Sequence, residues 1–389
     1  MNSYSPVLTS LTQTWRPEFP GLEQNTYLNT CSLGQLSKRN VAAVNRFLEL
    51  WMRYGASAWY EMWLGELADA RARFARLINA QPHEVAILPS IGVALSVIAS
   101  SLDYRTRPEV VVTEMDFPTV PYQWMARNRE GVQVRLLSSP DRISVPLAAF
   151  EDAIGPQTAL VATTHVFFTS GWVQDTAAIS RLAHAHGALA LFDGYQAAGQ
   201  IPVDVKATDV DIYLSGGLKW LLGGPGVVFL YVRGALIEQL HPTTTGWFAA
   251  KDMFKFNSER FEMADDARRF EPGTPAVAAV YAANAGMSII EEIGVEAIRT
   301  RTQELAADLH HRLRHAGLEP RLPDDLSRHA GITVLPVDDP PGVVKALKAR
   351  NIIIDYRPGL IRLSPYFYNT EEENQTLVDA LVAVLGRNP

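Results

Sequence analysis

Short continuous runs of apolar residues alternate with amphipathic segments between residues 85 and 232, and this alternation constrains the fold more than any other feature of the chain. Continuous apolar runs bounded by turn formers are typical of strands that are buried on both faces. We expect such strands at 85–89, 109–115, 132–137, 159–166, 188–193, 209–215 and 226–232. Because helical segments separate them, the pattern predicts an α/β fold with a mainly parallel, doubly wound sheet.

The sequence changes character after the PGTP turn at 272–275. Two long helices are expected at about 276–292 and 294–316, and they lead into a mixed region of short strands and helices. A chain of 389 residues is too long for one simple core. We therefore expect an irregular N-terminal segment over 1–26, a large domain over 27–275 and a smaller C-terminal α+β domain over 276–389.

Charge and cysteine content exclude several classes of protein. The formal net charge of -7 lacks the basic excess of a nucleic-acid-binding surface, so no nucleic-acid partner is expected. The single cysteine, Cys31, excludes internal disulfides and a cysteine-based zinc site, and no other residues have the spacing of a metal site. No apolar run approaches the ~20 residues that span a bilayer, and the N-terminus lacks the pattern of a secretory signal. We expect a cytoplasmic protein without a membrane partner.

Three polar side chains stand where predicted strands stop, namely Ser90, Asp193 and Ser215. Mainly parallel sheets bind ligands at the carboxyl ends of their strands, so these residues are predicted to face one site. Asp193 ends the apolar run of LFDGYQAAGQ, and Lys219 stands 26 residues later in SGGLKWLLGGPG. Either residue alone would more often be a loop lysine or a turn former. Since one strand separates them, the amine and the carboxylate are expected together at the same edge of the sheet.

Pyridoxal phosphate (PLP) requires this combination of groups: a lysine amine, an acid beside the pyridine nitrogen, backbone N–H groups for the phosphate and a flat side chain over the ring. In apolar surroundings the pKa of Lys219 would fall, which enlarges the neutral, nucleophilic fraction of the amine. Asp193 supplies the acid, and Phe117 in EMDFPTV supplies the flat group. The segment Ser90-Ile91-Gly92 precedes a predicted helix, whose N-terminal N–H groups would bind the phosphate.

The stretch FDGYQAAGQIPVDV, followed by SGGLKWLLGGPGVVFLYV, resembles the aminotransferase class V group of the fold-type-I PLP enzymes. That group also contains kynureninases, isopenicillin-N-epimerase-like proteins, C–S lyases and cysteine desulfurases. The resemblance extends from YLNTCSLG to IRLSPYFYNTEEE, which is nearly the whole chain. It implies the PLP-transferase fold of type I, with a large PLP-binding domain and a smaller C-terminal domain.

The resemblance also implies roles for individual residues. Lys219 would be the Schiff-base lysine, and Asp193 would pair with the pyridinium nitrogen. Gln196 would bind the ring hydroxyl or the imine side of the cofactor. Thr169 lies in the strand-end turn HVFFTSG, which faces the cofactor in the family. Arg362 in LIRLSP matches the arginine that grips the substrate's α-carboxylate, where a fork of donors suits two oxygens.

Two further residues are implied to work across a dimer. Thr274 in EPGTP resembles the threonine that reaches the phosphate in the neighbouring subunit, and Trp247 in TTGWF resembles an element of kynureninase. The resemblance therefore implies a homodimer with shared active sites. Phe117 is similar to the stacking residue of kynureninase-like members, whereas many other class V members carry a histidine there.

The chain departs from the family in two places. Many members carry Ser-x-His-Lys around the Schiff base, whereas Lys219 follows two glycines and a leucine, so the hydroxyl of Ser215 stands one step earlier. Desulfurases need a cysteine in their C-terminal half, and Cys31 is near the N-terminus. This argues against a desulfurase.

We therefore predict an aminotransferase for a small amino acid, in which the freed Lys219 removes the α-proton. A kynureninase-like hydrolase, a C–S lyase or an epimerase on the same cofactor remains the alternative. A non-catalytic PLP-binding protein is disfavoured, because the lysine, the aspartate and the carboxylate-binding arginine are all present. A nicotinamide dehydrogenase is disfavoured because no G-x-G-x-x-G follows an early strand.

Overall fold

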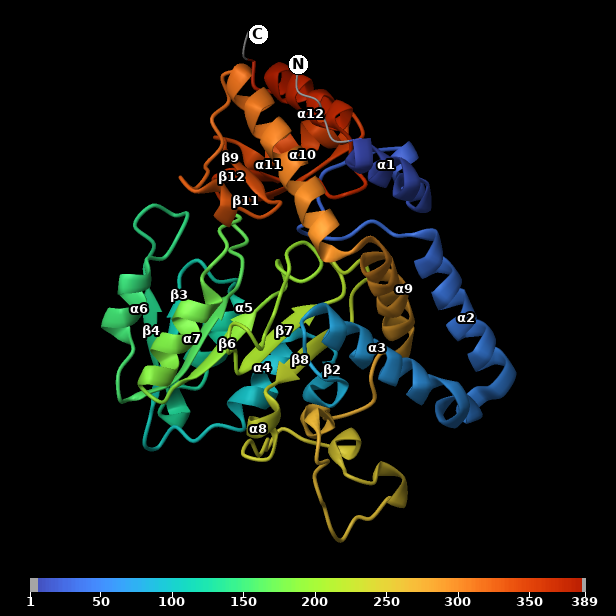
Figure 1. The fold of residues 1–389 in the computed structure, drawn as a ribbon, viewed down its shortest axis with the longest axis vertical. Coiled ribbons are helices and arrows are strands. Elements are labelled where there is room, and N and C mark those ends of the chain that lie inside the picture. Colours follow the sequence, from blue (N-terminus) through green and yellow to red (C-terminus); the bar gives the residue numbers. More distant parts are fainter. Residues whose placement is uncertain (1–5, 387–389) are drawn as a thin grey trace.

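The computed structural model describes residues 6–386, with the side chains of residues 11–386. The first five residues of the N-terminal segment predicted at 1–26, and the last three of the domain predicted at 276–389, lie outside the described residues. Figure 1 shows a large body built on a twisted sheet and a smaller body that contains the C-terminal helices. No helix in the described part of the chain is long and apolar enough to span a membrane.

The large body is organised around a seven-stranded sheet. In spatial order the strands are β2 (Val85–Leu88), β8 (Val228–Val232), β7 (Ile212–Gly216), β6 (Leu189–Asp193), β5 (Thr158–Thr164), β3 (Glu109–Thr113) and β4 (Gln133–Leu137). The five strands from β7 to β4 run parallel, and only β8 runs antiparallel to its two neighbours. The predicted mainly parallel α/β sheet is therefore confirmed.

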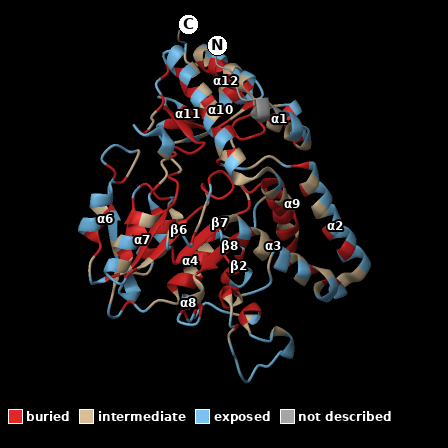
Figure 2. Cartoon of the chain, viewed as in Figure 1, coloured by how far each residue is buried: buried red, intermediate tan, exposed pale blue. Residues whose placement is uncertain are grey.

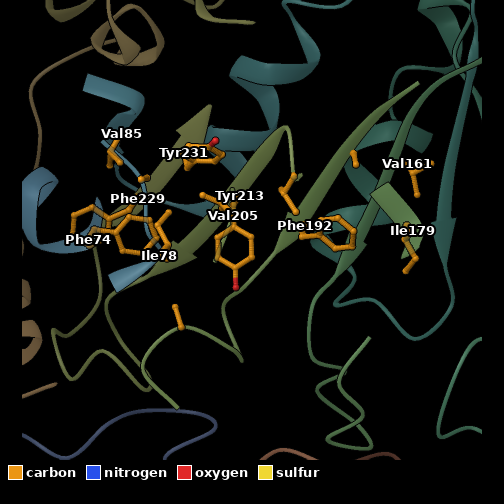
Figure 3. Close-up of a cluster of buried hydrophobic side chains, with 14 of the residues drawn as sticks. Phe74, Ile78, Val85, Val161, Ile179, Phe192, Val205, Tyr213, Phe229 and Tyr231 are labelled. Carbon is orange, nitrogen blue, oxygen red and sulfur yellow. The ribbon is translucent and has the colours of Figure 1, made fainter. Parts of the chain in front are cut away.

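Both faces of the sheet are covered by helices, because side chains alternate between the faces along each strand. Val161 packs into one core cluster, and its neighbours Leu160 and Ala162 pack into the other. The first cluster includes side chains from α3 (Leu64–Leu77), α6 (Leu147–Ala153), α7 (Thr176–Ala185) and α9 (Val277–Ile293). The second includes side chains from α4 (Ile91–Ala99), α5 (Thr119–Met125) and α8 (Gly234–Ile237). Figure 3 shows part of the first cluster, and Figure 2 shows that the central strands β6, β7 and β8 are almost entirely buried.

The small body consists of an antiparallel sheet and three helices. The sheet has the order β11 (Asp355–Arg357), β12 (Leu360–Leu363) and β9 (Thr333–Pro336). The helices are α10 (Val295–His315), α11 (Pro340–Lys348) and α12 (Glu371–Val384). Thr370 and Glu373 form a capping box at the start of α12, since each side chain accepts the other residue's backbone N–H.

The N-terminal segment differs from the irregular structure expected over 1–26. Residues Pro6–Trp15 form helix α1, and the ensuing chain packs on the small body. The hydroxyl of Thr12 donates to the carbonyl of Phe367, and Arg16 forms an ion pair with Glu373 at 2.9 Å. Strand β1 (Thr26–Tyr27) then pairs with β10 (Ile352–Ile353). Contacts with the distant C-terminal part determine this structure, which is why local sequence gave no sign of it.

Helix α9 was expected to be the first helix of the C-terminal domain predicted from residue 276. It packs instead against α3 and against α2 (Lys38–Tyr54), both in the large body. Its residues Val280, Ala283 and Met287 belong to the core cluster on the sheet. Figure 1 shows α9 beside α2 and α3. When the boundary is drawn from these packing contacts, the small body begins with α10 rather than with α9.

Candidate active site

Asp193 is the last residue of β6, a central strand of the sheet, and its side chain is buried at 3 % exposure. The backbone N–H of Tyr195 donates to its Oδ1 at 2.9 Å. Burial raises the pKa of Asp193 to about 6, although the Tyr195 N–H and the charge of Lys219 oppose this rise. A nearby cation would bring the pKa down again, so the site is suited to a positively charged partner for this carboxylate.

Lys219 follows β7, the strand next to β6, and its amine lies among aromatic rings. The Nζ atom is 4.6 Å from the centre of the Tyr195 ring and 5.8 Å from the centre of the Phe117 ring. Burial lowers the pKa of Lys219 to about 8, and the positive charge of Arg362 acts in the same direction. Cys31 and Asp193 act to raise this pKa. Near pH 7 the neutral fraction of the amine is therefore far larger than that of an ordinary lysine, as a nucleophile or base requires.

Close approaches of the backbone shape the turn that carries Lys219. A Cβ atom at Gly216 would overlap the ring of Tyr195, so only glycine fits there. Gly34 donates its N–H to the carbonyl of Leu218 at 2.8 Å, and a Cβ atom at Gly34 would overlap the carbonyl oxygen of Lys219. The loop that contains Cys31 and Gly34 thus covers the Lys219 turn.

The first turn of α4 offers backbone donors near the same aromatic rings. Ser90 caps this helix, since its Oγ accepts the N–H of Val93 at 3.3 Å. The N–H groups of Ile91 and Gly92 precede the first intrahelical bond and have no acceptor within the helix. A Cβ atom at Gly92 would lie 3.9 Å from the Thr119 side chain, which places the helix N-terminus close to the segment after Phe117. Free N–H groups of this kind can hold a phosphate.

Arg362 enters the site from the small body on β12, and its side chain is fully buried. Its Nη1 donates to the carbonyl of Phe168 at 3.1 Å, and its Nη2 donates to the Ser32 hydroxyl at 2.7 Å and to the Asp355 carboxylate. Burial acts to raise the pKa of Asp355, but the Ser32 hydroxyl and the charge of Arg362 lower it to about 2. The Nε of Arg362 is buried and lacks an acceptor among the described residues. A buried donor without a partner is costly, so it indicates where a ligand oxygen would bind.

Three further residues were predicted to contact the cofactor, and the structure gives each of them a different environment. Thr169 lines a cavity of about 500 Å³ beside Phe168 and is accessible to a ligand. Gln196 donates to the carbonyl of Cys31 at 2.9 Å and accepts from the indole N–H of Trp220 at 2.7 Å. Ser215 is fully buried, and its hydroxyl donates to the carbonyl of Gly194 at 3.2 Å. The structure therefore uses the polar groups of Gln196 and Ser215 within the protein, so cofactor contacts by these two residues stay predictions.

Trp247 and Thr274 lie in exposed segments rather than beside Lys219. The Trp247 indole is 41 % exposed and donates to the carbonyl of Met253 in its own loop. Thr274 is exposed in the turn before α9. A Cβ atom at Gly246 would overlap the carbonyl of Pro272, so the two segments are neighbours. Figure 1 shows this loop projecting from the large body on the side opposite to the small body.

Two buried polar residues at strand ends were missed from the sequence. Asp116 follows β3 and accepts hydrogen bonds from the N–H of Thr164 and the hydroxyl of Thr163, and burial raises its pKa. His165 follows β5, its Nδ1 lies 3.0 Å from the hydroxyl of Tyr213, and burial lowers its pKa to about 4. The strand-end argument that selected Asp193 applies equally to both residues and could have found them.

Comparisons with known proteins agree with this geometry. The family described as aminotransferase class-V matches residues 35–377 of the chain. The uncharacterized aminotransferase YcbU of Bacillus subtilis is 37% identical over 96% of this chain and 98% of its own length. A kynureninase of Bacillus anthracis is 30% identical over 92% of this chain and 88% of its own. The solved apo cysteine desulfurase of Thermococcus onnurineus has the same fold, with a TM-score of 0.87 at 22% identity, covering 99% of this chain and 100% of its own.

Proposed function

Since the chain belongs to the aminotransferase class-V family, whose members are PLP-dependent enzymes, we propose that it is a PLP-dependent aminotransferase acting on a small amino acid. The observation that supports this best is the pairing of the half-buried Lys219 with the buried Asp193, because the charge of each alters the pKa of the other. An amine with a pKa of about 8 beside a buried carboxylate is the donor set that PLP requires.

The residues present fit this cofactor. Lys219 would hold its carbonyl carbon, and Asp193 would hold its ring nitrogen. The ring of Phe117 would cover one face, and the N–H groups of Ile91 and Gly92 would bind the phosphate. When bound, PLP supplies an electron sink that stabilises negative charge at the substrate's α-carbon.

The chain's own residues would then orient the substrate and move one proton. Arg362 binds the α-carboxylate through its free Nε, which fixes the direction of the α-hydrogen. The neutral amine of Lys219 takes that proton and returns it, because its lowered pKa lies close to working pH. The rings of Tyr195 and Phe117 lie next to the amine and limit the directions in which it can move. Asp193 remains ionised beside the cationic ring nitrogen.

A desulfurase reaction is disfavoured by the structure of the small body. Strands β11 and β12 are joined by the two-residue turn Pro358-Gly359, in which Gly359 has a φ of 77°. Neither this turn nor the rest of the C-terminal half of the sequence contains a cysteine, which a desulfurase would need there. Cys31 itself is fully buried under the Lys219 turn.

Kynureninase-like hydrolysis is the second candidate. It is favoured by Phe117, which lies over Lys219 where a histidine is common in the family, and by the 30% identity to a kynureninase. The experiment that separates the two reactions mixes the PLP-loaded protein with a panel of L-amino acids. Conversion of the cofactor to its pyridoxamine form supports transamination. No conversion, together with release of L-alanine from L-kynurenine, would show that the hydrolase proposal is right.

We also propose a cytoplasmic homodimer that shares its active sites. Trp247, Phe256 and Phe261 are 41 %, 67 % and 50 % exposed, and such a patch of aromatic rings is typical of an interface. Thr274 lies beside this patch, so one surface would carry both residues expected to act in the neighbouring subunit. Light scattering should give twice the chain mass, and Phe256→Asp with Phe261→Asp should give monomers; a wild-type monomer would contradict this proposal.

A further inference from the structure

A cavity of about 500 Å³ next to the proposed active site is rich in arginine. Arg142 comes from the loop after β4, Arg321 from the segment before β9, and Arg357 from the end of β11. Glu114 is the one carboxylate among the lining residues, and it accepts the backbone N–H of Ser139 at 2.7 Å. The cavity therefore has an excess of positive charge.

Phe168 connects this cavity to the residues around Lys219. Its ring lines the cavity and lies 5.3 Å from the ring of Phe117. The guanidinium carbons of Arg357 and Arg362 lie 5.8 and 6.0 Å from the same ring. The charge of Arg357 also lowers the pKa of Lys219. A substrate held by Arg362 therefore has this cavity within reach of its side chain.

Two of the three arginines have no ionic partner within the described part of the chain. Arg357 contacts Asp355 at 2.8 Å, and Asp355 is shared with Arg362. No ion pair involves Arg142 or Arg321 in residues 11–386. Arg142 is held in place by the preceding Asp141, whose Oδ1 accepts the backbone N–H of Ile143 at 2.7 Å and of Ser144 at 2.9 Å. The loop thus presents a guanidinium group that forms no ion pair with any described residue.

We propose that the substrate is an amino acid whose side chain ends in an anionic group. This inference rests on the function proposed above and specifies its substrate class. Arg362 binds the α-carboxylate, and Arg142, Arg321 and Arg357 bind the distal anion. Guanidinium groups are suited to oxyanions because they form paired, charge-assisted hydrogen bonds. A side-chain carboxylate, phosphate or sulfonate shares this chemistry.

The test compares the PLP-loaded wild type with the double variant Arg142→Gln/Arg321→Gln. The matched control is Arg105→Gln/Arg129→Gln, which removes the same charge from two exposed arginines away from the cavity. Binding is measured by thermal shift and by cofactor absorbance with glutarate, a dicarboxylate, and with butyrate, a monocarboxylate. We expect wild type and control to bind glutarate at least tenfold more tightly than butyrate, and the double variant to lose this preference. Arg142→Lys/Arg321→Lys should restore part of it.

The reaction with substrates separates this inference from the proposed function. Half-reaction rates are compared for L-alanine, L-aspartate, L-glutamate, O-phospho-L-serine and L-cysteate, and the fastest acidic substrate identifies the distal group. If L-alanine reacts as fast as every acidic amino acid and glutarate shows no preference, the anionic substrate class is wrong while transamination stands. If no amino acid reacts but glutarate binding depends on Arg142 and Arg321, transamination is wrong while the anion site stands. Equal loss of glutarate binding in the control variant would also overturn the site.

Discussion

The two sides of the proposed active site are built on different principles. On the sheet side, Asp193 ends β6 and Asp116 follows β3, and backbone N–H groups donate to both carboxylates. On the small-body side, Arg362 is held by side chains, namely Ser32 and Asp355, that are far from it in sequence or on another strand. Burial is the main cause of the raised pKa of Asp193, whereas hydrogen bonding and charge pairing set the low pKa of Asp355. The side chains on the sheet side are therefore already positioned before a ligand binds. The side chains on the small-body side are held by contacts that a substrate can replace.

The largest effect is expected from Lys219→Ala, which removes the sheet-side amine. The half-reaction rate should fall by about 10³-fold or more, because a positioned general base alone contributes about 10²–10⁴. Stopped-flow absorbance at saturating amino acid measures this rate. Lys206→Ala removes an exposed lysine and serves as the control. A Lys219→Ala protein that retained a tenth of the rate would show that another residue moves the proton.

Asp193→Asn tests whether the sheet side is built for a cationic partner. Breaking a buried charge pair costs about 3–5 kcal/mol, so the Kd for PLP should rise by about 10²-fold or more. Equilibrium titration of the apo-protein with PLP measures the change. Asp211→Asn is the matched control, because Asp211 is equally buried but precedes β7 and accepts the N–H of Ala190 at the other end of the strands. Equal weakening in both variants would mean that general destabilisation, rather than the charge of Asp193, is responsible.

The same contrast explains how much the sequence could predict. The sheet-side residues follow strands, so a local pattern of apolar runs was sufficient to select Asp193, Ser90 and the neighbourhood of Lys219. Arg362 was identified only by family resemblance. Its partner Ser32 is separated from it by 330 residues, and the Ser32–Asp355 contact spans 323. No local pattern encodes such contacts, because tertiary packing alone brings these segments together. The wrong expectation for the N-terminal segment has the same cause.

Burial also acts on two neighbouring histidines, His310 on α10 and His329, which pairs with Trp172 of the large body. Here burial affects the stability of the fold rather than the chemistry of the site. Burial lowers the pKa of His310 to about 3 and of His329 to about 4. Unfolded histidine has a pKa of about 6.5, so the unfolded chain binds more protons between these values. The free energy of unfolding should therefore fall as the pH falls from 7 to 5, by about 2 kcal/mol for each histidine.

Urea unfolding at both pH values measures this effect as the difference between wild type and His329→Gln. The variant should show the smaller fall in stability between pH 7 and 5. His83→Gln, at an exposed position, should behave as the wild type. If His329→Gln shows an unchanged pH dependence, His329 has an ordinary histidine pKa in the folded protein and burial does not lower it.

The smallest effect is expected from Asp355→Asn. This variant tests whether a substrate carboxylate can replace the contact that Asp355 makes with Arg362. Asp355 has a pKa of about 2, so it is ionised at working pH and competes with a substrate carboxylate for Arg362. Removing its charge should tighten the binding of butyrate by about 3- to 10-fold, because the guanidinium of Arg362 would then have no competing carboxylate. Glu319→Gln, which breaks a surface pair with Arg314, should leave binding unchanged. Weaker binding in Asp355→Asn would mean that Asp355 orients Arg362 for the substrate rather than occupying its place, and both sides of the site would then be fixed in advance.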